Sequence, residues 1–331
     1  MINPIIASLK RECEVLRKGG IPKPRMAILT PTYKCNQNCY YCFFKKKNNG
    51  DMIDTDKFCT FIKQIADFGI ESIEYCGGGE SLLLPNIEQV FKYAHSLGLR
   101  QGLLTNGVLF DGVIAQTFLK YGTYVRFSID TIDKIKYKKI RGADDCDRVK
   151  MNIEKAIAIK QRHDHMCQIS LKVGYAKELE MEDIQGVFDF AFNKRIYSIQ
   201  LKNVWDENGN YYNNDLQKQD IYKIIKTHGT RFNKKIGAKK KMRERCWISP
   251  IQVTIDAYGD VYLCCYFQGR EDSHKIGNLH KSNLQELWGS ETHLKALRST
   301  RINDCQKHDC RMIRYMDQWR QQEKSNDIYF V

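Results

Sequence analysis

Short runs of β-forming residues alternate with amphipathic helical stretches up to about residue 202, and this alternation limits the fold more than any other feature. Between the first two runs, apolar residues recur at helical spacing, at Phe58, Phe61, Ile62, Ile65 and Phe68. Strands and helices that alternate in this way form parallel β/α units with right-handed crossovers. Six units predict an α/β fold, a partial (β/α)6 TIM-like barrel. Its strand runs are residues 26–31, 72–76, 102–105, 124–130, 168–173 and 197–202.

The composition changes after the sixth run, which indicates a second domain. Residues 206–245 are polar and rich in Asn and Lys, and from Cys246 onward short strands, turns and scattered cysteines follow. Gly259 and Asp260 are typical of a hairpin turn between two of those strands. We therefore expect an N-terminal helical extension at residues 1–24, the barrel at 25–235 and a cysteine-bearing domain at 236–331.

The lack of targeting and membrane-spanning segments favours a cytoplasmic protein, and the net positive charge favours anionic partners. The N-terminus has no secretory pattern, and no segment approaches the roughly 18 apolar residues of a spanning helix, so no membrane partner is expected. In a reducing compartment, 13 cysteines indicate metal binding or redox chemistry. Of the net charge of +14, a large share lies in residues 231–245. We interpret that segment as a solvated linker, with contact to phosphate, peptide or RNA as the alternative.

Three closely spaced cysteines directly follow the first strand run, in the pattern Cys35-x3-Cys39-x2-Cys42. Three thiolates can hold three irons of a [4Fe-4S] cluster and leave the fourth iron open to a substrate or cofactor. A structural zinc site is the alternative, but it needs a fourth ligand and usually shows Cys-x2-Cys pairs. The spacing therefore predicts a catalytic iron–sulfur cluster.

This cysteine motif resembles that of the radical S-adenosylmethionine (SAM) superfamily, in which the open iron binds the amino and carboxylate groups of SAM. The sequence CGGGES at the end of the second run resembles the GGE motif of the family, with Ser81 where proline is usual. The resemblance implies that the glycines and Glu80 bind the SAM amino group. It also implies that the backbone of Tyr41 lies against the adenine, and that Ser128 and Arg141 contact SAM and its carboxylate. The full set of implied cofactor contacts is Tyr41, Gly78, Gly79, Glu80, Thr105, Asn106, Ser128 and Arg141. A purely structural turn is the alternative for Thr105 and Asn106.

Four cysteines near the C-terminus could ligate an auxiliary [4Fe-4S] cluster: Cys246, Cys264, Cys305 and Cys310. The spacing from Gly259 to Cys264 resembles the G-x4-C signature of the SPASM/twitch extension of radical SAM enzymes. Cys264 and Cys265 are neighbours on a predicted strand, so only one of them should reach the cluster, and the glycine spacing favours Cys264. Zinc held by the same four cysteines stays open as an alternative.

The resemblance implies that SAM is cleaved to a 5'-deoxyadenosyl radical, which removes a hydrogen atom from the substrate. The electron for this cleavage would come from a flavodoxin- or ferredoxin-like donor. Because an auxiliary cluster could accept a second electron, we expect an oxidoreductase, dehydrogenase-like, acting on a small polar substrate such as a carbohydrate or aminocyclitol. Candidates for the catalytic base are Asp130 and Glu178. The alternatives are SPASM-type modification of a ribosomal peptide and a zinc-dependent nucleic-acid-binding module, although nucleic acid is not the expected partner.

Overall fold

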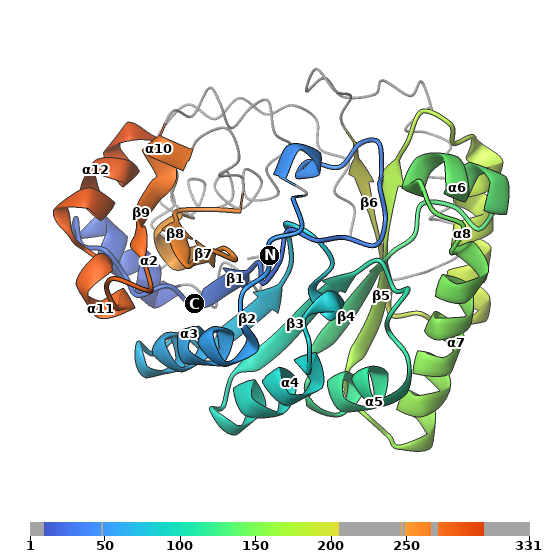
Figure 1. Ribbon diagram of the computed structural model, residues 1–331, viewed down its shortest axis with the longest axis horizontal. Coiled ribbons are helices and arrows are strands. Elements are labelled where there is room, and N and C mark those ends of the chain that lie inside the picture. Colours follow the sequence, from blue (N-terminus) through green and yellow to red (C-terminus); the bar gives the residue numbers. More distant parts are fainter. Residues whose placement is uncertain (1–9, 48, 205–245, 247–248, 266–270, 301–331) are drawn as a thin grey trace, which may run out of the picture.

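The computed structural model describes residues 10–47, 49–204, 246, 249–265 and 271–300. A sheet of nine strands runs through these residues in the order β6-β5-β4-β3-β2-β1-β7-β8-β9. It curves but does not close, because β6 and β9 form its two edges (Figure 1). The expected partial barrel is confirmed, with all six strand runs present. The strands are β1 (Met26–Leu29), β2 (Ser72–Tyr75), β3 (Arg100–Thr105), β4 (Tyr124–Ser128), β5 (Gln168–Tyr175), β6 (Ser198–Asn203), β7 (Gln252–Ile255), β8 (Asp260–Tyr262) and β9 (Lys275–Asn278).

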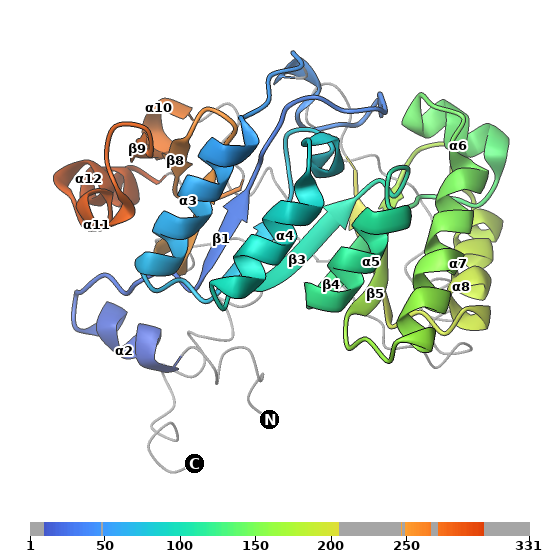
Figure 2. The same cartoon turned by 60° about the horizontal axis from the view of Figure 1, so that its bottom comes forward.

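Helices cover the outer face of the sheet, and the candidate site lies on its inner face. Figures 1 and 2 show α3, α4, α5 and α7 side by side along the outer face. None of the helices described is both long and apolar enough to span a membrane. The helices are α2 (Lys10–Arg17), α3 (Thr55–Asp67), α4 (Ile87–Ser96), α5 (Gly112–Tyr121), α6 (Lys134–Arg141), α7 (Cys146–Arg162), α8 (Met181–Asn193), α10 (Glu271–His274), α11 (Leu284–Leu287) and α12 (Glu291–Ser299). Short 3₁₀ turns are η1 (Lys45–Lys47), η2 (Ser81–Leu83) and η3 (Ser249–Ile251).

Helix α3 shows how the sequence pattern produces these outer helices. The side chain of Asp54 caps its N-terminus and accepts hydrogen bonds from the backbone N–H groups of Asp56 and Lys57, both at 3.1 Å. The apolar residues at helical spacing form one face, and this face is buried against the sheet, as the periodicity predicts. Its members are Phe58, Phe61, Ile62, Ile65 and, just after the helix, Phe68.

The strands from β4 to β6 have an apolar outer face and a polar inner face. On β4, Val125 and Phe127 are fully buried in the core shared with the helices, and Arg126 and Ser128 alternate with them on the other side. The interior of a closed β/α barrel is normally filled by Val, Ile and Leu. From β4 to β6 the inner face is mostly polar instead, and together with the segment after β4 it lines one side of a cavity, through Arg126, Ser128, Asp130, Lys172, Gly174, Gln200 and Lys202.

The C-terminal region extends the same sheet. Strand β7 pairs in parallel with β1, and β8 and β9 then continue antiparallel. The predicted hairpin is confirmed, with Gly259 at a φ of +77° in its turn. The expectation that Cys264 and Cys265 lie on a strand is wrong, because β8 ends at Tyr262 and both cysteines lie in the bend beyond it. The proposed domain boundary near residue 236 and the basic segment 231–245 lie outside the described residues.

Candidate active site

A cavity of about 320 Å³ lies among the ends of the strands and the cysteine loop that follows β1. Active sites of β/α barrels gather at the carboxyl ends of the strands because the loops converge there. This cavity brings together most of the residues that the sequence singles out. They are Cys35, Cys39, Tyr41, Cys42, Gly78, Gly79, Glu80, Thr105, Asn106, Ser128, Asp130 and Arg141.

The end of helix α6 holds the cysteine loop in place. The backbone N–H of Asn38 donates to the carbonyl of Arg141 at 2.9 Å. The side chain of Gln37 donates to the hydroxyl of Tyr137 at 2.9 Å. Gly142 ends the helix at a φ of +63°, and a Cβ there would lie 2.7 Å from the carbonyl oxygen of Asn38. The close approach of helix and loop therefore requires glycine at this position.

The glycines after β2 pack directly on the chain that leads into the cysteine loop. The backbone N–H of Gly79 donates to the carbonyl of Thr32 at 2.7 Å, and that of Glu80 donates to the carbonyl of Lys34 at 2.9 Å. A Cβ on Gly79 would lie 1.8 Å from the carbonyl oxygen of Lys34. Only glycine allows this contact, so the GGGE segment fixes where the cysteine loop begins.

The carboxylate of Glu80 joins the segment after β2 to the turn after β3. It accepts hydrogen bonds from the Thr105 hydroxyl at 2.8 Å and from the Asn106 backbone N–H at 2.7 Å. Burial raises the pKa of Glu80, and these hydrogen bonds partly oppose that rise. The structure thus gives Glu80 and Thr105 a definite role in building the site, while their contact with SAM stays a prediction.

Two polar side chains approach the cysteine sulfurs. Arg141 Nη1 lies 3.8 Å from the Sγ of Cys39, and Asn106 Nδ2 lies 4.0 Å from the Sγ of Cys35. Burial raises the pKa of the Cys35 thiol to about 11, so this thiol stays protonated at neutral pH unless a metal ion binds its sulfur. Three thiols lining one cavity, with N–H donors beside two of them, fit an iron–sulfur cluster better than a free nucleophile.

Asp130 connects three separate parts of the chain below this loop. Its carboxylate accepts from the Tyr41 hydroxyl at 2.6 Å and from the Gly174 backbone N–H at 2.7 Å. The Nε of Arg141 lies 2.8 Å from the same carboxylate, and both side chains are almost fully buried. A Cβ on Gly174 would lie 3.0 Å from Asp130 and 3.2 Å from the Tyr41 hydroxyl. Asp130 therefore organises the site, since both of its oxygens are engaged.

The other predicted site residues fall outside this group. Glu178 accepts a hydrogen bond from the Tyr40 hydroxyl at 2.6 Å and does not line the cavity. Cys246 is described and its Sγ accepts from the backbone N–H of Ser249 at 3.4 Å, whereas Cys305 and Cys310 lie outside the described residues. Of the adjacent pair beyond β8, Cys265 lines the cavity, and the cavity lining does not include Cys264.

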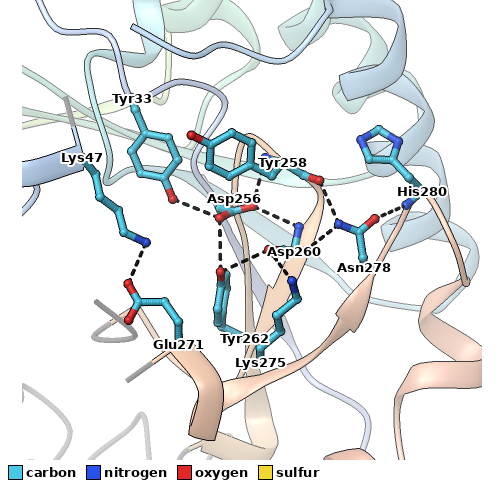
Figure 3. Close-up of polar contacts among 10 residues, drawn as sticks. All are labelled: Tyr33, Lys47, Asp256, Tyr258, Asp260, Tyr262, Glu271, Lys275, Asn278 and His280. Carbon is cyan, nitrogen blue, oxygen red and sulfur yellow. Dashed lines mark hydrogen bonds and ion pairs between the residues drawn. The ribbon is translucent and has the colours of Figure 1, made fainter. Parts of the chain in front are cut away.

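The β7–β8 hairpin is fixed to the cysteine loop by a buried polar contact (Figure 3). The hydroxyl of Tyr33 donates to Oδ2 of Asp256 at 3.0 Å, and the hydroxyl of Tyr262 lies 3.4 Å from the same oxygen. Burial raises the pKa of Asp256. Near the surface, Lys47 pairs with Glu271 at 2.7 Å. The hairpin that leads to Cys264 and Cys265 is thus held directly against the segment that leads into the cysteine loop.

The basic and amide side chains on the inner face of β4 to β6 were not predicted from the sequence. Arg126, Lys172, Gln200 and Lys202 line the cavity from β4, β5 and β6. Each alternates with buried apolar residues along its strand, a period-two pattern that is visible in the sequence. The signal was therefore present, but it gains meaning only once the inner face of the barrel is known.

Two families match this chain by their models. Residues 29–191 match the radical SAM superfamily, and residues 246–311 match an iron–sulfur cluster-binding domain named SPASM. A probable GTP 3',8-cyclase of Methanococcus maripaludis is 33% identical over 135 residues, which are 40% of this chain and 45% of that protein. A second, of Methanocaldococcus jannaschii, is 29% identical over 57% of this chain and 63% of its own length. The chain therefore spans about half the length of these curated relatives.

Solved structures share the fold across most of this chain. Streptococcus suis SuiB bound to its precursor peptide SuiA has a TM-score of 0.68 at 17% identity, covering 89% of this chain and 71% of SuiB. The protein anSMEcpe with bound AdoMet has a TM-score of 0.62 at 19% identity, covering 88% of this chain and 87% of anSMEcpe. At these identities the likeness is one of fold, and it extends from the barrel into the C-terminal region.

Proposed function

Since this chain belongs to the radical SAM superfamily and carries a SPASM domain, we propose that it is an oxidoreductase that removes a hydrogen atom from a small polar substrate. Its cofactors are SAM, a SAM-binding [4Fe-4S] cluster and an auxiliary iron–sulfur centre. When bound, SAM and its cluster would supply the one-electron radical chemistry that is needed to take a hydrogen atom from an unactivated C–H bond. A flavodoxin- or ferredoxin-like protein is the electron donor that we expect.

The observation that carries this proposal is a single cavity with the cysteine loop on one side and a polar barrel wall on the other. We assign Cys35, Cys39 and Cys42 as ligands of the SAM-binding cluster. Arg141 and Asn106 would donate to the sulfurs, because their nitrogen atoms already lie near two of them. The remaining predicted SAM contacts line the same cavity and would orient the cofactor there.

We assign Asp130 as a positioning residue. A base must reach the substrate with a free oxygen, but both oxygens of Asp130 are already engaged by protein groups. Glu178 is a poor candidate for the base, because it does not line the cavity and its carboxylate accepts from Tyr40. For the auxiliary centre, we propose Cys246, Cys264, Cys305 and Cys310 as ligands, and this centre would supply an acceptor for the second electron.

The test is anaerobic turnover of the reconstituted enzyme with candidate substrates deuterated at single carbons. Deuterium in 5'-deoxyadenosine, measured by mass spectrometry, identifies the substrate and the attacked position. The variant with Cys35, Cys39 and Cys42 all changed to Ala should lose one cluster, about four irons, and all formation of 5'-deoxyadenosine. Cys59→Ala is the matched control, since Cys59 lies on α3 and does not line the cavity. Full SAM cleavage by the triple variant would contradict the proposal.

Peptide modification is the second candidate, supported by the likeness in fold to SuiB with its precursor peptide and to anSMEcpe with bound peptides. The substrate panel should therefore contain deuterated peptides, an aminocyclitol and GTP, the last because relatives are named probable GTP 3',8-cyclases. Deuterium transfer from a peptide alone would favour peptide modification over the leading proposal. A zinc-dependent nucleic-acid-binding module is not retained, because both matching families are iron–sulfur families.

A further inference from the structure

Three basic side chains lie on the inner wall formed by β4, β5 and β6, and we call Arg126, Lys172 and Lys202 the basic wall. All three line the cavity. Lys172 pairs in register with Ser128 on one side and with Gln200 on the other. Arg126 lies two residues before Ser128 on the same face of β4, about 7 Å further from the carboxyl ends of the strands. Lys202 pairs with Gly174, two residues beyond Lys172 toward the carboxyl ends of the strands, so the basic wall extends to both sides of the level of Ser128, a predicted SAM contact.

The acids that line the cavity near the basic wall are engaged elsewhere. Asp130 pairs with Arg141, and Glu74 accepts a hydrogen bond from the hydroxyl of Tyr124. Glu80 is bonded to the turn after β3, as described above. These contacts engage the carboxylates of Asp130, Glu74 and Glu80 with other groups of the protein.

The contacts of Arg126 and Lys172 also leave them able to bind an anion. Within the described parts of the chain, neither Arg126 nor Lys172 has a carboxylate at ion-pair distance. Arg126 donates from Nη1 to the amide oxygen of Gln200 at 3.1 Å, and its Nε is buried without a hydrogen-bond partner. A buried donor without a partner is costly. An acceptor bound in the cavity would remove that cost.

The pKa of Lys172 also favours a bound anion beside the basic wall. Burial, together with the charge of Lys202, lowers the pKa of Lys172 from its ordinary 10.5 to about 8. Lys172 is thus still charged at neutral pH although it is desolvated and repelled by its neighbours. A bound anion would relieve both effects, because it restores the favourable interaction that burial removed.

We infer that the basic wall is an anion subsite that binds a carboxylate or phosphate group of the substrate, with Lys172 as its central contact. This inference rests on the proposed function, to which it adds the chemical class of the substrate. The carboxylate of SAM has the same chemistry, but Arg141 is its predicted contact, and Ser128 is a predicted contact of SAM. The wall extends deeper than those residues, to Arg126.

The test is calorimetric titration of the anaerobically reconstituted enzyme with pyrophosphate at pH 7, with saturating SAM and no reductant. The wild type should bind one pyrophosphate in the cavity, and Lys172→Met should bind it at least tenfold more weakly. Lys172→Arg, which keeps the charge, should retain binding within a few fold. Lys57→Gln removes an exposed lysine of α3 and should equal the wild type. Thermal unfolding establishes that each variant is folded.

The outcomes separate the two sources of the anion and the two proposals. Equal pyrophosphate binding by wild type and Lys172→Met would overturn the inference. A tenfold loss of SAM affinity in Lys172→Met, or pyrophosphate binding seen only without SAM, would overturn it in favour of the SAM carboxylate. Formation of 5'-deoxyadenosine by the wild type is measured separately. Its loss would contradict the proposed function, whereas a failed titration with SAM cleavage intact would remove only the subsite.

Discussion

Replacing Asp130 by Asn should destabilise the protein strongly, because it leaves a buried cation without its partner. Arg141 and Asp130 lie 2.8 Å apart, and their side chains are 5% and 1% exposed. Removing one partner of such a pair typically costs about 3 to 5 kcal/mol. The asparagine keeps the shape of the side chain and can still accept one hydrogen bond from Tyr41 or Gly174. The loss therefore reports mainly the charge.

The assay is chemical denaturation of the anaerobically reconstituted enzyme, within a double-mutant cycle that includes Arg141→Met. Because the double variant has no unpaired charge, it should be more stable than Asp130→Asn alone. Iron content should also fall in Asp130→Asn, since Tyr41 of the cysteine loop loses a charged acceptor. A loss below about 1 kcal/mol, the value of an exposed ion pair, would refute this reasoning. A variant with unchanged stability and iron but slow turnover would instead identify Asp130 as a base.

Three further predictions follow from the same structure. Gly79→Ala should lose iron and SAM binding, because its Cβ would lie 1.8 Å from the carbonyl oxygen of Lys34. An iron assay and calorimetry measure both losses. Wild-type SAM affinity in this variant would contradict the close packing of Gly79 on Lys34. Cys246→Ala should lower the iron content while leaving SAM affinity unchanged, and an unaltered iron content would remove Cys246 from the ligand set. Burial lowers the pKa of His293 from 6.5 to about 4, so the unfolded chain binds the proton more tightly. The free energy of unfolding should fall as the pH drops from 6.5 to 4, by at most about 3 kcal/mol. Denaturation of His293→Gln should show a smaller fall, and an identical pH dependence would exclude His293 as the cause.

Much of the fold could be predicted from local patterns. The spacing of Phe58, Phe61, Ile62 and Ile65 predicts α3, and the six β-rich runs correspond to β1 through β6. Such patterns suffice because helix and strand periodicities are properties of the backbone and appear in any short segment. The end of β8 at Tyr262 was not predicted, since strand ends depend on pairing with a neighbour.

Part of the candidate site could also be predicted from local sequence. The three cysteines after β1 lie within one loop, so their spacing alone predicts a cluster. The proposed ligands Cys305 and Cys310 and the segment 205–245 lie outside the described residues, and for them the sequence is still the only guide.

By itself, the sequence determined the order of the elements, the cysteine loop and the glycines that pack beside it. Only the tertiary structure decided that Tyr41, Asp130 and Arg141 meet, that β7 joins β1, and that Lys172 faces the cavity. The reason is physical. Contacts within a turn or helix follow from the covalent chain, whereas contacts between strands far apart in sequence depend on their order and register in the sheet. Register placed polar residues of three strands on one inner wall and gave the cavity a charged side from β4 to β6.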